Sequence, residues 1–90
     1  MQYSDNVQIL QESDEEWLLL INNEKVFNYL VLKLKTDFGF GRFMKVSSSF
    51  GGSDGFEYKI KLFDISKDVF IRHIGILTPE YLNNVAAGTV

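Results

Sequence analysis

The chain has 90 residues, with 12 acidic and 9 basic side chains, one His, one Pro and no Cys. This length fits one domain, residues 1–90, and a 46% hydrophobic fraction with 8 Phe excludes a disordered chain. Without Cys there is no disulfide framework, no thiolate nucleophile and no Cys-based zinc site. The N-terminus lacks a secretory signal and no apolar run approaches the roughly 20 residues that span a bilayer. We therefore expect a cytoplasmic protein with no membrane partner.

Charge is unevenly distributed along the chain. Residues 1–24 contain six carboxylates and no Lys or Arg, whereas residues 33–61 contain six basic residues and three acidic ones. One interpretation is that solvated faces simply differ. The other is that the acidic head faces a cationic partner, or the basic middle faces an anion.

The first half of the chain predicts strands in chain order. Residues 7–11 form a first strand. Residues 13–22 are ambiguous, because Ser13 and Glu16 have capping-box spacing, which suits a helix start. However, Asn22 and Asn23 separate two apolar runs, and Asn tolerates the positive φ of a tight turn. We favour a hairpin over residues 16–36 and keep a helix over 13–22 as the alternative.

The faces of this hairpin follow from the two-residue period of a strand. Apolar residues recur at alternate positions on one face, and residues 30–35 alternate most regularly. The residues of that face are Trp17, Leu19, Ile21, Val26, Leu30, Leu32 and Leu34.

The second half of the chain predicts further strands and one helix. A turn at 37–41 precedes a strand at 42–50, and the loop at 51–55 ends in Asp54-Gly55, a hairpin signal. Residues 56–62 alternate as a strand, 64–68 turn, and 69–77 form the last strand. Thr78 as N-cap, Pro79 at the first helical position and Gly88 as stop delimit a helix. The expected fold is a mostly β antiparallel meander of five or six strands with a short C-terminal helix, or α+β if 13–22 is helical.

The chain shows no constellation typical of catalysis. His73 lies in a predicted strand with no nucleophile marked nearby, and the acidic residues lack the spacing of a calcium loop. The Gly-rich loop at 51–55 precedes a strand and not a helix, unlike a phosphate-binding loop. We expect a non-enzymatic protein with no cofactor and no metal.

One segment points to nucleic acid. Residues 38–43, Phe-Gly-Phe-Gly-Arg-Phe, resemble the aromatic-glycine strand of cold-shock and RRM-type RNA-binding domains, departing at Phe38 and Arg42. The alternative function is thus single-stranded nucleic-acid binding by a basic-aromatic sheet face, where bases stack and lysines meet phosphates. Its residues would be Lys33, Lys35, Phe38, Phe40, Arg42, Lys59 and Lys61.

The leading hypothesis is a small binding protein that acts through a protein–protein interface, of the inhibitor, immunity or phage-encoded antagonist type. The second face of the hairpin is also apolar near its turn, and a small domain rarely leaves such a surface uncovered. By default the C-terminal helix, the first strand or a sandwich fold would cover it. Otherwise a protein partner or a second copy in a homo-oligomer would cover it, with the acidic head as rim. The expected partner-binding residues are Leu18, Leu20, Phe27, Tyr29, Val31, Glu15 and Glu16.

Overall fold

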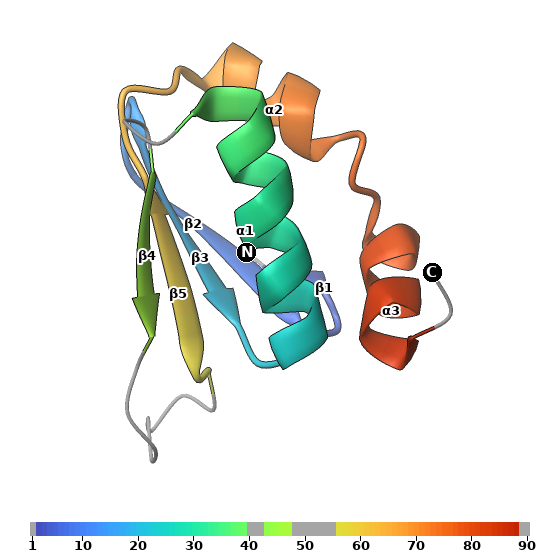
Figure 1. Cartoon of the computed structure of the whole chain (residues 1–90). Helices are drawn as coiled ribbons and strands as arrows, with labels where there is room; N and C mark the ends of the chain where they lie inside the picture. Colours follow the sequence, from blue (N-terminus) through green and yellow to red (C-terminus); the bar gives the residue numbers. More distant parts are fainter. Residues whose placement is uncertain (1, 40–42, 48–55, 89–90) are drawn as a thin grey trace.

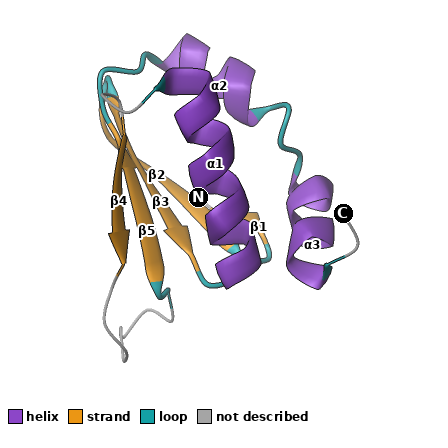
Figure 2. Ribbon diagram, viewed as in Figure 1, coloured by secondary structure: helices purple, strands orange, loops and turns teal. Residues whose placement is uncertain are grey.

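The computed structural model describes residues 2–39, 43–47 and 56–88 of the chain. It belongs to the α+β class, with helices packed on one face of an antiparallel sheet (Figures 1 and 2). The elements in chain order are β1 (Gln2–Ser4), β2 (Val7–Ser13), β3 (Glu16–Ile21), α1 (Glu24–Phe38), β4 (Phe43–Ser47), β5 (Tyr58–Leu62), α2 (Lys67–Ile74) and α3 (Pro79–Ala87).

The strands lie in the order β1-β2-β3-β5-β4, and every pair is antiparallel. Four strands of five to seven residues form the body of the sheet, fewer than the five or six expected, and three-residue β1 adds a short edge. The expected meander is wrong beyond β3, because α1 follows β3 and β5 lies between β3 and β4. The predicted strands at 7–11 and 56–62 are confirmed, as is the hairpin pairing of β4 with β5; its loop at 51–55 lies outside the described residues.

The predicted hairpin at 16–36 is half right. Residues 16–21 form strand β3 between β2 and β5, which rules out the alternative helix at 13–22. Residues 24–38, however, form helix α1. Asn23 is the N-cap of this helix and not a turn residue, since its Oδ1 accepts a hydrogen bond from the Val26 N–H at 3.1 Å. Val26, Leu30 and Leu34 recur every four residues and are buried on its inner side.

The predicted last strand at 69–77 is wrong, because residues 67–74 form helix α2. Phe70 and Ile74 are four residues apart and buried, whereas Ile71 is 51% exposed. The apolar residues of this segment are therefore spaced for one buried face of a helix and not for the alternating faces of a strand.

The C-terminal helix α3 is confirmed at both ends. Thr78 Oγ1 accepts from the Tyr81 N–H at 3.1 Å, and Pro79 occupies the first turn. Gly88 ends the helix at φ 76°, a left-handed conformation that favours glycine. Helix α3 packs against α1 and β1.

The core lies between the sheet and the helices. Strands β2, β3 and β5 point alternate side chains toward the helices, and Leu19, Ile21, Ile60 and Leu62 are completely buried. In Figure 1 none of the helices in the described part of the chain lies on the other face of the sheet. That outer face carries Leu18 and Leu20 of β3 in register with Lys61 and Lys59 of β5.

Tyr29 and Tyr81 join α1 to α3, with ring centroids 5.6 Å apart. Burial, followed by the interactions with Tyr81 and Asp37, raises the pKa of Tyr29 to about 12. An unfolded tyrosine titrates near pH 10, so above that pH the unfolded chain loses this proton while the folded chain keeps it. We expect the free energy of unfolding to be unaffected by Tyr29 below pH 10 and to fall as the pH rises from about 10 to 12. Urea unfolding of the wild type and Tyr29→Phe at pH 9 and pH 11.5 checks this, because the phenylalanine variant should lose less stability. An equal loss in both proteins would show that Tyr29 does not carry the effect.

Candidate functional site

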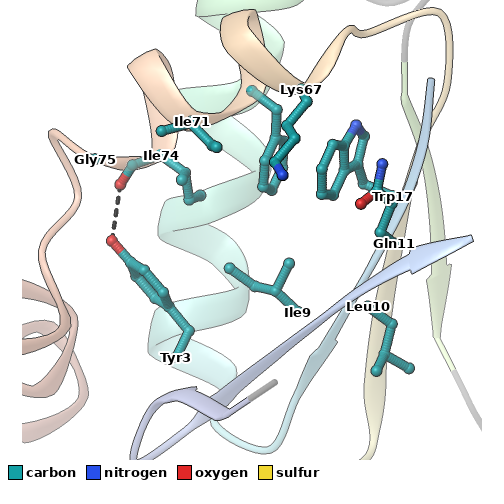
Figure 3. A pocket seen from close by; sticks show the side chains of 10 residues that line it. Tyr3, Ile9, Leu10, Gln11, Trp17, Lys67, Ile71, Ile74 and Gly75 are labelled. Atoms are coloured by element: carbon teal, nitrogen blue, oxygen red, sulfur yellow. Dashed lines mark hydrogen bonds between the residues drawn. The ribbon is translucent and has the colours of Figure 1, made fainter. Parts of the chain in front are cut away.

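The site with the most distinctive geometry is a groove of about 580 Å³ between β2 and α2, hereafter the β2–α2 groove (Figure 3). This volume is within the range of pockets that bind ligands. Its lining comes from β1, from β2 and β3, and from α2, and is almost entirely apolar. The lining residues are Tyr3, Ile9, Leu10, Gln11, Trp17, Lys67, Phe70, Ile71, Ile74 and Gly75.

One end of the groove is closed by Tyr3. Its hydroxyl donates to the Ile74 carbonyl oxygen at 3.0 Å or to the Leu77 carbonyl oxygen at 2.7 Å, and Figure 3 shows the ring between β1 and the end of α2. Burial raises the pKa of Tyr3 above its ordinary value of 10.0, although the hydroxyl is a donor at neutral pH even without this shift. These bonds tie the C-terminal end of α2 to the sheet edge across more than 70 residues of sequence.

The floor of the groove is held by Trp17. Its indole ring stacks on Phe70 with centroids 4.1 Å apart and planes 4° from parallel, and its Nε1–H donates to the Ile65 carbonyl oxygen at 2.9 Å. The Ile65 N–H in turn donates to the Glu15 carbonyl oxygen at 3.1 Å. The turn before α2 is therefore fixed to the β2–β3 turn, and α2 stands over the sheet edge without filling the space beneath it.

The mouth of the groove combines exposed apolar and charged groups. Ile71 is 51% exposed on α2, and Lys67 and Gln11 are also exposed. The end of β2 and the β2–β3 turn carry the exposed carboxylates of Glu12, Asp14 and Glu15, which we call the acidic rim. Lys61 approaches Glu12 at 3.9 Å, whereas Asp14 and Glu15 have no ion pair within the described chain.

The residues expected to bind a protein partner do not form one surface. Phe27 is 3% exposed and stacks on Tyr58 in the core, so the premise of an uncovered second hairpin face is wrong. Leu18 and Leu20 lie on the outer face of the sheet, while Tyr29 and Val31 belong to α1. Of this set, Glu15 lies in the acidic rim, and Glu16 begins β3 beside it, 3.8 Å from Lys61.

The basic-aromatic residues are also divided. Lys33 and Lys35 lie on α1, whereas Lys59 and Lys61 alternate with the buried Ile60 and Leu62 and so lie on the opposite face of the sheet. The single continuous stripe expected from the sequence is thus not formed by these four lysines. Phe38 is half-buried at the end of α1, and Phe40 and Arg42 lie outside the described residues.

His73 lies on α2, not on a strand, and connects it to the end of α1. Its Nδ1 is 3.5 Å from Asp37 Oδ2, while Lys33 Nζ is 3.6 Å from the other oxygen of that carboxylate. The Phe38 ring packs against the imidazole with centroids 4.7 Å apart. Within residues 2–39, 43–47 and 56–88, no group of three or more His, Cys, Asp or Glu side chains could hold a metal ion. Among the same residues, no helix has the length and apolar character to cross a membrane.

Comparison of the chain with protein-family models, with curated proteins and with solved structures gives no match. Sequence reasoning missed the β2–α2 groove because its walls come from segments far apart in the chain, although the acidic residues at 12–16 are visible in the sequence.

Proposed function

We propose that this chain is a protein-binding module that holds an apolar segment of a partner protein in the β2–α2 groove. The observation that carries the proposal is an apolar hollow of about 580 Å³ with an exposed isoleucine, Ile71, at its mouth. Exposed apolar surface gathered in a concave site is typical of interaction sites, because binding removes it from water.

The charges at the mouth define the partner further. The acidic rim lies in the chain between the groove residues Gln11 and Trp17; Glu12 contacts Lys61 on the outer face of the sheet, whereas Asp14 and Glu15 have no cation within the described chain. Opposite charge at the edge of an interface speeds association and selects partners. A segment with bulky apolar residues followed by Lys or Arg fits this arrangement. Lys67, at the same end, would contact the backbone carbonyls or a carboxylate of such a segment.

Peptide selection tests the proposal. Random dodecapeptides displayed on phage would be selected on the wild-type protein, and dissociation constants measured for the enriched peptides by fluorescence of Trp17, the single tryptophan. We expect peptides rich in bulky apolar and basic residues, and an at least tenfold loss of affinity in Ile71→Asp, about 1.4 kcal/mol.

The matched control is Ile76→Asp, because Ile76 is 67% exposed but does not line the groove. This variant should bind the selected peptides within about twofold of the wild type. Circular dichroism would confirm that both variants are folded. Equal effects of the two substitutions, or binding of small apolar dyes with no enrichment of peptides, would overturn the proposal.

A further inference from the structure

The hydrogen-bond pattern of the sheet shows which backbone N–H and C=O groups of β2 point away from β3, toward the open edge beside the groove. The Asn22 N–H donates to the Asn6 carbonyl oxygen at 3.1 Å, which makes these two a hydrogen-bonded pair. In an antiparallel ladder such pairs alternate with non-hydrogen-bonded ones. The register then makes Leu10 and Leu18 a hydrogen-bonded pair, so the N–H and C=O of Gln11 point away from β3.

Gln11 lies beyond the reach of β1. In the described chain β1 pairs only with Val7 and Gln8, and no other described strand lies beside residues 11–13 of β2 on that side. Gln11 is exposed, and its side chain lines the groove (Figure 3). Within the described chain, an uncovered length of strand edge therefore begins at Gln11 beside the β2–α2 groove, and the register of β2 with β3 shifts between Gln11 and Ser13.

An open strand edge is a template for another strand. A strand placed beside Gln11 would turn alternate side chains toward the helix side of the sheet, which here is the groove under α2. One ligand would therefore fit both features. Its extended backbone would pair with the strand edge, and bulky apolar side chains at every second position would enter the groove. The acidic rim follows directly along β2, where the same strand would present its basic residues.

We propose that the partner segment binds by β-augmentation, adding to the sheet as an extended strand along residues 11–13 of β2 with its alternate side chains in the groove. This inference rests on the proposed function and specifies its ligand as an extended peptide. Main-chain hydrogen bonds at the edge supply affinity, and the groove supplies specificity.

The test compares Gln11→Pro with Gln11→Ala, using the tightest-binding dodecapeptide from the phage selection as probe. Proline removes the edge N–H, and because this N–H points away from β3 the ladder of the sheet stays intact. Alanine removes the same side chain and keeps the N–H. We expect Gln11→Pro to bind the peptide three- to tenfold more weakly than Gln11→Ala, because both variants lack the same side chain and only the proline lacks the N–H.

A second measurement does not depend on the folding of the proline variant. Single N-methyl groups would be placed at each position of the same peptide in turn, and each peptide titrated against the wild-type protein. A strand that pairs on one side should lose affinity at alternate positions only. Suppose that Ile71→Asp weakens binding, but that N-methylation shows no alternation and Gln11→Pro has no effect. This result would overturn strand addition and would still support binding in the groove. If the selection yields no peptide that depends on Ile71, groove binding itself fails.

Discussion

Replacing Trp17 with alanine is expected to lower the free energy of unfolding by about 3–5 kcal/mol, the range for removing a large aromatic side chain from a core. Trp17 is 5% exposed and joins the sheet to α2 by stacking on Phe70 with centroids 4.1 Å apart. Small domains are stable by only about 5–15 kcal/mol, so this loss would consume a large share of the total. Urea unfolding followed by circular dichroism measures it, since the variant has no tryptophan left to report fluorescence.

Trp17→Phe separates the two contributions of this side chain. Phenylalanine keeps a ring to stack on Phe70 but cannot donate to the Ile65 carbonyl oxygen, which Trp17 Nε1 reaches at 2.9 Å. The expected loss is about 1–3 kcal/mol, the range for leaving a buried acceptor unsatisfied and for the smaller ring. A loss below 1 kcal/mol for Trp17→Ala would mean that α2 is not held on the sheet by this stack.

The strands of the body could be predicted because their signals are local. In residues 58–62 polar and apolar side chains alternate, and only the two-residue period of a strand sorts Lys59 and Lys61 from Ile60 and Leu62. The C-terminal helix could also be predicted from the sequence, because the residues that begin and end it, Thr78, Pro79 and Gly88, act on backbone groups within a few residues of themselves. The strand order could not be predicted, because no short sequence pattern specifies that β5 lies between β3 and β4.

The groove could not be predicted from the sequence because it exists only between elements. Tyr3 reaches the carbonyl groups of Ile74 and Leu77, and Trp17 meets Phe70, across separations of 53 to 74 residues. Within the described residues, β1 runs from Gln2 to Ser4 and does not reach Gln11, and no pattern in residues 1–6 specifies this length. The protein-binding face predicted on the hairpin is not formed, because Phe27 is buried in the core, and the role of the acidic head as a rim stays a prediction.

Residues 24–38 show how one pattern permits two structures. As a strand, Leu30, Leu32 and Leu34 would share a face, which is why a hairpin was predicted there. As a helix, Leu30 and Leu34 are four residues apart and share a face, and Leu32 points the other way. The structure has Leu30 and Leu34 at 0% and 1% exposure and Leu32 at 65%. The cap at Asn23 favours the helix, because it satisfies an N–H group that a hairpin turn would not leave free.

A matched pair of leucine substitutions distinguishes the helix from the strand experimentally. Leu34→Ala should lower the free energy of unfolding by about 2–5 kcal/mol, because it leaves a cavity between α1 and the sheet. Leu32→Ala, two positions away on the same helix, should change it by less than about 0.5 kcal/mol, because that side chain is already in water. Urea unfolding of both variants gives the two values. If residues 30–34 formed a strand, Leu32 and Leu34 would share a face, and both substitutions would lower the free energy of unfolding by similar amounts. Comparable losses would therefore support the hairpin and contradict α1. The β2–α2 groove would then lose its support, since the same core that buries Leu34 holds the sheet on which Trp17 and Gln11 are placed.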